Sequence, residues 1–342
     1  MTETVDDALP PDPDHAGPDP APDVMTPSRI EGAAALLGQR VRTTPVLTVD
    51  GAELEVAGRV SLKLELLQHS GTFKARGALH YMLANPIAEA GVTAASGGNH
   101  GVAVAWAAGR LGHRATIFVP TISAPAKVAR LRALGADVVQ TGTVYAEALA
   151  ACDEHQAATG ATAIHAYEAP DVMAGAGTTG RELEAQVRGA GAPALDSVLV
   201  ACGGGGLVGG VAGWLGDRTT VVACETEGTA AWARAREAGR PVDVEVNGVA
   251  ADALGASRLG SLAFRTLLAA DARSVVVPDE AVMAARRRLW DDYRLVVEAS
   301  AAVPVAAVLT GAWSPEPGQH TGIIVCGANT APGDLDPEGR AR

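Results

Sequence analysis

The alternation of two hydrophobic periods constrains the fold of this chain more than any other feature. From about residue 29 onward, short runs rich in β-branched residues alternate with stretches whose apolar residues recur every three or four positions. Such alternation is typical of a parallel sheet covered by helices, so we predict an α/β fold. The clearest helical patterns span residues 126–134 and 280–293. The expected strands span residues 60–66, 92–95, 115–119, 138–140, 163–167, 197–201, 220–224, 274–277 and 322–325.

Residues 1–24 do not share this alternation. They are dominated by Pro, Asp and Ala, with no large apolar residue repeating at helical or strand spacing, and we predict that they form a disordered tail. The whole chain has 342 residues, of which 48% are hydrophobic and 19% charged, which is typical of a globular protein of one large or two linked domains.

The charge and hydropathy of the chain argue against several kinds of partner. The formal net charge is -12 without any compensating basic run, which disfavours nucleic acid and anionic membranes as partners. The longest apolar stretches are interrupted by glycine and fall short of the roughly 20 residues that a membrane span needs. The N-terminus also lacks the basic-then-apolar order of a secretory signal. We therefore expect a cytoplasmic protein that binds a small molecule.

The cysteines suggest neither a zinc site nor a disulfide framework. The chain has four cysteines, which are widely separated and form no CxxC pair. We predict no metal site, and we expect the first three to be small buried hydrophobic residues. The four are Cys152, Cys202, Cys224 and Cys326.

Two of the expected strands run into glycine-rich turns and then into helix-like segments. These are residues 92–101 (VTAASGGNHG) and 197–210 (SVLVACGGGGLVGG). Such a turn presents bare backbone N–H groups at a helix N-terminus, where proteins often hold an anionic group. Neither segment matches the dinucleotide or P-loop motif. A flexible linker is the alternative for the tetraglycine, but the apolar runs on both sides of it disfavour that interpretation.

Lysine is rare in this chain, which draws attention to the lysines that remain. There are three among 27 basic residues. Schiff-base chemistry needs an amine that can lose its proton, which arginine cannot supply. Lys63 lies in an alternating strand and is expected to face solvent, and Lys127 opens a helical pattern as an expected surface charge. Lys74 lies between a strand and a helix in the glycine-punctuated segment 69–77, and is the candidate. The alternative for Lys74 is a surface lysine at a helix start.

Four motifs follow one another along the chain at wide spacing. Together they resemble the fold-type II (tryptophan synthase β-like) pyridoxal-phosphate (PLP) enzymes, in particular the threonine/serine dehydratase and serine racemase branch. The likeness covers roughly residues 27–330. The motifs are HSGTFKARGA at 69–78, SGGNHG at 96–101, GGGG at 203–206 and CGAN at 326–329.

The resemblance implies an architecture and a set of site residues. It implies two open, twisted, mostly parallel α/β lobes with PLP between them, the large PLP-binding domain comprising residues 25–83 and 171–342 and the small substrate-loop domain residues 84–170. The implied substrate-binding residues are Ser96, Gly97 and His100. The implied cofactor-binding residues are Phe73, Lys74, Asn99, Gly203, Gly204, Gly205, Gly206, Leu207 and Cys326.

The resemblance also implies what these residues do. Lys74 would carry the cofactor and then remove the α-proton of the substrate, and the tetraglycine with Leu207 would surround the phosphate. Asn99 would bind the ring hydroxyl oxygen, with Phe73 packed near the ring. The substrate loop would hold the substrate carboxylate. Cys326 would face the pyridine nitrogen and leave it largely neutral, which favours departure of a β-substituent over transamination.

The implied activity is that of a PLP-dependent ammonia-lyase, a carbon–nitrogen lyase of the EC 4.3.1 type. It would remove water from threonine or serine and leave a 2-oxo acid and ammonia, in an enzyme expected to be a homodimer. One alternative is PLP-dependent β-elimination or β-replacement on a different hydroxylated amino acid. The other is a non-catalytic α/β amino-acid-binding protein, which would have no need of a lysine in this motif.

Three departures from the family pattern bear on the substrate and the reaction. Gly97 stands where racemases have a serine, so we expect no racemisation. Residues 298–302 read EASAA in place of the usual Glu-Pro-x-Gly, and Ala328 replaces a glycine, and both changes could reshape the substrate pocket. Glu225 matches the first carboxylate of a cation site found in some relatives, but no acid other than Glu227 follows it before Glu237, so we expect a divalent site to be at best incomplete.

Overall fold

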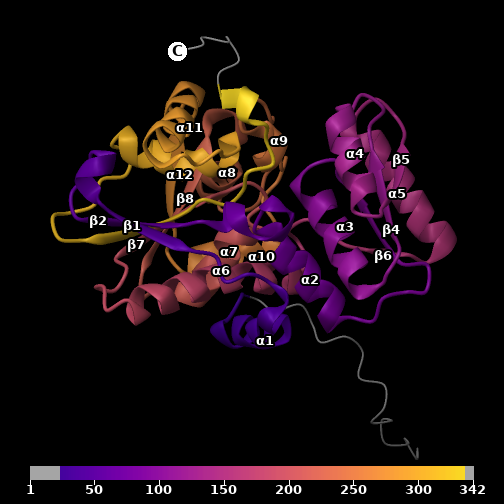
Figure 1. The fold of residues 1–342 in the computed structure, drawn as a ribbon, viewed down its shortest axis with the longest axis horizontal. Coiled ribbons are helices and arrows are strands. Elements are labelled where there is room, and N and C mark those ends of the chain that lie inside the picture. The colour runs from indigo at the N-terminus through magenta and orange to yellow at the C-terminus, as the bar shows by residue number, and fades with distance from the viewer. Residues whose placement is uncertain (1–23, 336–342) are drawn as a thin grey trace, which may run out of the picture.

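The computed structural model describes residues 24–335, which form two α/β lobes side by side (Figure 1). The tail predicted for residues 1–24 lies outside the described residues, apart from Val24. We call the part built on the larger sheet the large lobe and the part built on the smaller sheet the small lobe. Within the described part, no helix is both long and apolar enough to cross a bilayer.

The large lobe is built on a six-stranded sheet. Its strands are parallel except for β1, which pairs antiparallel with β2 at one edge. The chain therefore has the predicted parallel sheet, with an additional edge strand. In spatial order the strands are β1 (Val46–Asp50), β2 (Arg59–Lys63), β10 (His320–Ile324), β7 (Ser197–Ala201), β8 (Thr220–Thr226) and β9 (Arg273–Val277).

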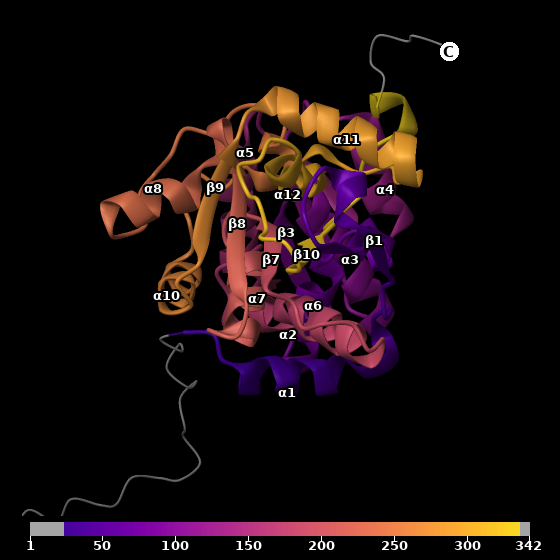
Figure 2. The same ribbon diagram turned by 90° about the vertical axis from the view of Figure 1, so that its left-hand side faces the viewer.

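Helices cover both faces of this sheet. Figures 1 and 2 show α11 and α12 over one face and α1, α6 and α7 over the other. The helices of this lobe are α1 (Pro27–Leu37), α6 (Pro170–Gly189), α7 (Gly206–Leu215), α8 (Ala231–Ala238), α9 (Ala251–Leu254), α10 (Ser261–Ala269), α11 (Asp279–Tyr293) and α12 (Ala299–Leu309). Short 3-10 helices lie at η1 (Gly38–Arg40), η2 (Gly51–Leu54), η3 (Glu65–Leu67), η4 (His69–Gly71), η5 (Glu227–Thr229) and η6 (Pro332–Leu335).

The small lobe is built on a four-stranded parallel sheet. Its strands, in spatial order, are β5 (Asp137–Gln140), β4 (Ala115–Val119), β3 (Val92–Ala95) and β6 (Thr162–Ala163). Its helices are α3 (Asn99–Leu111), α4 (Pro125–Ala133) and α5 (Tyr145–Thr159). Helix α2 (Lys74–Ala84) packs against both α6 and α3, and so connects the lobes. The domain boundaries expected at residues 84 and 170 stay a prediction.

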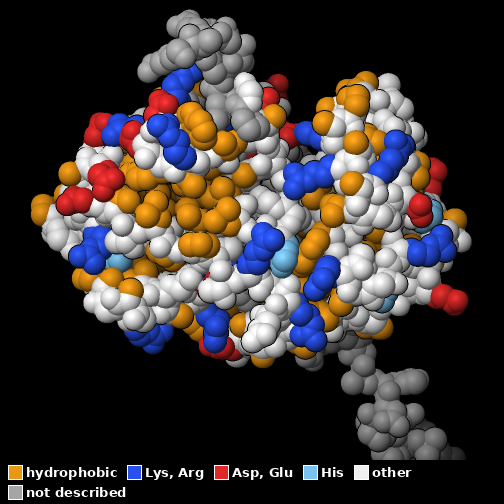
Figure 3. Space-filling view, viewed as in Figure 1, with side chains coloured by type: hydrophobic (Ala, Val, Ile, Leu, Met, Phe, Trp, Pro, Cys, Tyr) orange, Lys and Arg blue, Asp and Glu red, His pale blue; other side chains and the backbone are white. Residues whose placement is uncertain are grey.

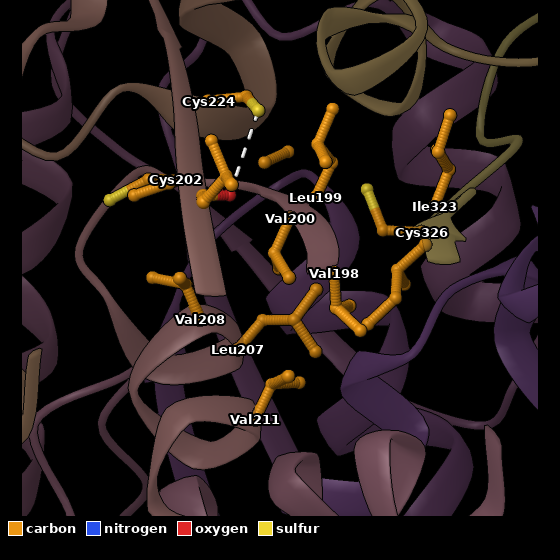
Figure 4. Close-up of a cluster of buried hydrophobic side chains, with 14 of the residues drawn as sticks. Val198, Leu199, Val200, Cys202, Leu207, Val208, Val211, Cys224, Ile323 and Cys326 are labelled. Carbon is orange, nitrogen blue, oxygen red and sulfur yellow. Dashed lines mark hydrogen bonds between the residues drawn. The ribbon is translucent and has the colours of Figure 1, made fainter. Parts of the chain in front are cut away.

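The hydrophobic core of the large lobe holds in place the two elements that flank the tetraglycine turn. Figure 4 shows Val198 and Val200 of β7 packed with Leu207 and Val211 of α7, and all four side chains are buried. Burying a side chain of this size stabilises the fold by about 1.5–3 kcal/mol. Because β7 and α7 are held in this way, the tetraglycine turn that joins them has fixed ends.

Some of the expected strands differ in extent from those observed. The strand expected over 60–66 ends at Lys63, because the chain turns there into η3, and the strand expected over 163–167 has only the two residues of β6. Strand β1 was not expected. Its residues are partly exposed at the sheet edge, so they lack the continuous apolar run of a central strand. The four cysteines are buried and free, as expected for the first three.

The prediction that Lys63 faces solvent is wrong. The residue is completely buried, and its Nζ donates to Glu182 Oε1 at 2.5 Å, to Gln186 Oε1 at 2.7 Å and to the Thr44 carbonyl at 2.7 Å. Strand β2 lies inside the sheet with α6 packed nearby, so both of its faces are covered. The ammonium is tolerated there because a carboxylate and two further acceptors surround it. By contrast, Lys127 is partly exposed, as expected.

Candidate active site

A cavity of about 750 Å³ opens between the two lobes. Figure 3 shows the surface hollowed between them on its upper side, where α9 of the large lobe faces α4 of the small lobe. Three of the loops that line the cavity follow the carboxyl ends of β3, β7 and β10. Ligands of open α/β sheets commonly bind at such strand ends. The fold thus brings segments that are far apart in the sequence, the first at Phe73 and the last at Cys326, to one cavity.

All of the residues predicted to bind cofactor or substrate line this one cavity. The structure therefore brings the four motifs together, while their individual roles stay proposals. The residues are Phe73, Lys74, Ser96, Gly97, Asn99, His100, Gly203, Gly204, Gly205, Gly206, Leu207 and Cys326.

Lys74 is the first residue of α2 and extends its amine into the cavity. Its Nζ lies 3.4 Å from the Ala166 carbonyl oxygen and 5.1 Å from the ring centroid of Phe73. Removal from water lowers the pKa of Lys74 to about 8, against the opposing influence of Cys326 and Glu298. More of this amine is therefore neutral near pH 7 than of an exposed lysine. A neutral amine is the form that attacks a carbonyl group.

The tetraglycine turn has no room for side chains. A Cβ added at Gly204 would lie 2.4 Å from the Tyr167 ring, and one at Gly205 would lie 2.5 Å from Ala263 Cβ. Gly205 also has a φ of +91°, which favours glycine. The bare backbone of the turn leads into α7, whose N-terminus carries partial positive charge. These features fit a bound phosphate group.

Cys326 lies two residues after the end of β10, opposite the start of α2. The Phe73 N–H donates to the Cys326 carbonyl at 3.1 Å, so the lysine segment is tied to the end of β10. Burial raises the pKa of the Cys326 thiol far above its usual range, and the nearby Glu298 adds to this effect. The thiol therefore stays neutral, as the proposed contact with a neutral pyridine nitrogen requires.

His100 of the substrate loop is held by a backbone carbonyl from outside that loop. Its Nε2 donates to the Ile164 carbonyl at 2.7 Å. Burial, helped by the charge of Lys74, lowers the pKa of His100 to about 3, so the ring is neutral. It cannot offer a positive charge to a substrate carboxylate. Binding of the substrate carboxylate by Ser96, by His100 as a neutral group and by the backbone N–H groups that lead into α3 stays a prediction.

Sequence reasoning missed three contributors to the cavity wall. Tyr167 covers the tetraglycine, and its segment carried no motif to mark it. Lys127 Nζ in α4 lies 2.6 Å from Asp252 Oδ1 in α9, so this ion pair joins the two lobes across the cavity. Glu298 is buried beside Asn99. Residues 298–302 depart from the family pattern in the sequence, but the contact of Glu298 with Asn99 depends on the fold and leaves no sequence signal.

Glu225, which matches one acid of a cation site, has a different role here. It is buried at the end of β8, where its two carboxylate oxygens accept the Trp232 N–H at 2.6 Å and the Ala233 N–H at 2.9 Å. The carboxylate thus caps α8. Burial raises the pKa of Glu225 to about 7. Residues 24–335 contain no cluster of three or more His, Cys, Asp or Glu side chains that could hold a metal.

Fold and site together are those of an α/β protein with a ligand cavity between two lobes, lined by a glycine turn suited to phosphate and by a lysine amine. A family model described as pyridoxal-phosphate dependent enzyme matches residues 37–327. The chain belongs to this family of PLP-dependent enzymes. The glycine turn, the lysine of lowered pKa and the neutral thiol all fit PLP, which confirms the predicted cofactor.

Individual relatives and solved structures narrow the class. The chain is 37% identical to phenylserine dehydratase from Ralstonia pickettii, over 89% of this chain and 93% of the relative. It is 34% identical to an L-threonine ammonia-lyase from Geobacter sulfurreducens, over 82% of this chain and 70% of the relative. The fold is similar to the structure of a threonine deaminase from T.th., with a TM-score of 0.83 and 35% identity over 90% of this chain and 99% of the other. It is also similar to the structure of maize serine racemase, with a TM-score of 0.84 and 28% identity over 92% of this chain and 97% of the other. These findings confirm the predicted fold type and the ammonia-lyase activity.

Proposed function

We propose that this ammonia-lyase removes water from a small β-hydroxy amino acid, threonine or serine, and releases a 2-oxo acid and ammonia. The observation that carries the proposal is the single cavity in which Lys74 meets the phosphate turn, the neutral thiol of Cys326 and the carboxylate-binding loop. The similarity to an L-threonine ammonia-lyase and to a threonine deaminase supports this choice of substrate. A non-catalytic binding protein is set aside, because the chain belongs to an enzyme family.

Each of the cavity residues has a separate role in the proposed reaction. Lys74 would hold the cofactor through its amine, and the same amine, in its neutral form, would take the α-proton of the substrate. Bound PLP supplies the electron-withdrawing group that makes this proton acidic and lets the β-hydroxyl depart. Ser96 and the loop backbone orient the substrate through its carboxylate. The neutral thiol of Cys326 would lie against the ring nitrogen of bound PLP and offer it no charge, an environment that favours elimination.

A second candidate substrate is a β-hydroxy amino acid with a larger apolar β-substituent. Apolar side chains from both lobes line the cavity. Of four of them, two are largely exposed: Ile122 at 76% and Tyr145 at 59%. The others, Tyr167 and Val246, are half-buried. Exposed apolar surface of this kind is stabilised when a ligand covers it. The similarity to a phenylserine dehydratase agrees with this alternative.

A panel of substrates distinguishes the two candidates. Ammonia and 2-oxo acid release from L-threonine, L-serine and 3-phenylserine should give the highest kcat/KM for threonine or serine. A preference for 3-phenylserine of about tenfold or more, equivalent to about 1.4 kcal/mol, would select the second candidate.

A variant of the cavity mouth adds an independent test of the second candidate. If an aryl group packs on Ile122, Ile122→Ser should lower kcat/KM for 3-phenylserine about tenfold, as expected for loss of one apolar contact surface. The rate with threonine should change little. Val139→Ser is the matched control, because Val139 is also an exposed apolar residue of the small lobe but lies outside the cavity.

We further expect the enzyme to eliminate without racemising. Racemisation needs a proton donor on the face opposite Lys74, and Gly97 has no side chain to provide one. A Cβ at Gly97 would lie 3.4 Å from Val119 Cγ1, an ordinary contact, so Gly97→Ser should fold. Pyruvate and D-serine formed from L-serine measure the two outcomes. D-serine formation by the unmodified enzyme at a rate comparable to pyruvate would contradict the expectation, whereas Gly97→Ser should raise the ratio of D-serine to pyruvate.

Two expectations from the sequence concern the protein beyond its site. Assembly into a homodimer and a location in the cytoplasm both stay predictions, as do the expected lack of nucleic-acid and membrane partners.

A further inference from the structure

Glu298 is a buried carboxylate at the junction between the two lobes. Its Oε1 accepts hydrogen bonds from Asn99 Nδ2 at 2.7 Å and from Ser300 Oγ at 2.7 Å, and its Oε2 accepts the Asn329 N–H at 3.3 Å. Burying a carboxylate costs several kcal/mol unless hydrogen-bond donors compensate. Burial raises the pKa of Glu298, and the three donors oppose that rise. So costly a group calls for a role that a neutral side chain would not fill.

The side-chain amide of Asn99 is held at both of its polar atoms. Its Nδ2 donates to Glu298, and its Oδ1 accepts a close hydrogen bond from Asn329 Nδ2. Asn99 begins α3 of the small lobe, whereas both partners belong to the large lobe. An amide nitrogen carries two hydrogens. Glu298 takes one of them, which leaves the other free for a group bound in the cavity that Asn99 lines.

We propose that Glu298 and Asn329 are positioning residues that fix the amide of Asn99 in one orientation, with an Nδ2 hydrogen available to the cofactor. The proposal rests on the assignment of Asn99 to the cofactor's ring hydroxyl oxygen. If the amide flipped, its Oδ1 would face that oxygen, and two acceptors would repel each other. The orientation depends on both lobes, because neither supplies the amide and its partners alone.

The carboxylate suits this task better than an amide would. A carboxylate only accepts hydrogen bonds, so the atom of Asn99 that faces it must be Nδ2. A glutamine at position 298 could accept from Asn99 with its oxygen, but its NH2 group would then face the Asn329 N–H, a contact between two donors. The amide could also turn to present its nitrogen to Asn99. Either result loosens the orientation of Asn99.

A double-mutant cycle on cofactor affinity tests the proposal. PLP is titrated back into the dialysed enzyme, and its dissociation constant is measured for Glu298→Ala, Asn99→Ala and the double variant. Each single change should weaken binding about tenfold, as expected for one hydrogen bond to a charged or polar group. Because Glu298 acts through Asn99, the double variant should bind no more than about twofold more weakly than Asn99→Ala. Additive losses, or an unchanged Glu298→Ala, would overturn the proposal.

A matched control separates positioning from general destabilisation. Asp171 accepts a hydrogen bond from Asn85 Nδ2 at 2.9 Å, so it forms the same kind of pair outside the cavity. Asp171→Ala should lower the Tm but leave PLP affinity and the visible absorbance maximum unchanged. Glu298→Gln, which keeps the shape of the side chain if the alanine variant does not fold, should shift the absorbance maximum and weaken PLP binding.

Two results would assign Glu298 a merely structural role and reject the proposal. The first is an equal loss of PLP affinity in Asp171→Ala, and the second is wild-type absorbance and affinity in Glu298→Gln. PLP titration involves no substrate, so its outcome is independent of whether threonine, serine or a larger amino acid is turned over.

Discussion

The Lys74→Ala variant is expected to lose essentially all turnover, by about a thousandfold or more, together with the visible absorbance of the bound cofactor. The reason is that Lys74 is proposed both to anchor PLP and to take the α-proton, and loss of a general base alone costs about a hundredfold to ten-thousandfold. Lys74→Arg should be equally inactive, because a guanidinium cannot become a neutral nucleophile at any pH at which the protein folds. The measurements are oxo-acid release and the absorbance spectrum.

The rarity of lysine makes the controls for this experiment simple. Lys127 lines the same cavity but pairs with Asp252 at its mouth, so Lys127→Ala should keep the cofactor absorbance. Lys63 is unsuitable as a control, because removing it would leave Glu182 without one of its buried partners. Normal turnover in Lys74→Ala would remove the proposed mechanism altogether.

The Gly205→Ala variant is expected to bind PLP at least about a hundredfold more weakly and to have a lower Tm. The added Cβ would lie 2.5 Å from Ala263 Cβ and 2.9 Å from Leu259 Cδ1, so the turn or α10 must shift. Overpacking of this kind costs about 1–3 kcal/mol. The positive φ of Gly205 adds about 1 kcal/mol or more for a residue with a side chain. Both effects move the N–H groups proposed to hold the phosphate, and PLP titration measures the loss.

Gly216 provides the matched control at the other end of the same helix. It too has a positive φ, +57°, but a Cβ there would meet no atom within 4 Å. Gly216→Ala should therefore lower the Tm through backbone strain alone and leave PLP affinity unchanged. Wild-type affinity in Gly205→Ala would argue against a phosphate at this turn, and a comparable loss in Gly216→Ala would trace the effect to α7 as a whole.

Much of the fold could be predicted from local sequence patterns. The strands expected at 92–95, 115–119 and 197–201 have the observed bounds, because each is a short apolar run that is buried on both faces or nearly so. The edge strand β1 could not be predicted in this way. Its burial neither alternates along the strand nor forms a continuous buried run, and its pairing with β2 depends on the turn between them.

The site could be predicted as a set of residues but not as a set of contacts. The motifs around Lys74, the tetraglycine and Cys326 all line one cavity, as the resemblance implied. His100 shows what the motif could not convey. Its hydrogen bond to the Ile164 carbonyl depends on a segment 64 residues further along the chain, and its ring is neutral because the fold buries it.

The sequence by itself determined the features that depend on neighbours along the chain: the period of each strand and helix, the positive φ that only glycine adopts readily at position 205, and the choice of lysine at position 74. The tertiary structure decided the features that depend on which distant groups come together. Lys63 is tolerated inside the sheet because α6 brings Glu182 to it, and Glu298 accepts a hydrogen bond from Asn99 because the two lobes meet there. Charge, burial and hydrogen bonding act through space, so the environment of an ionisable group is known only when its neighbours in the fold are known.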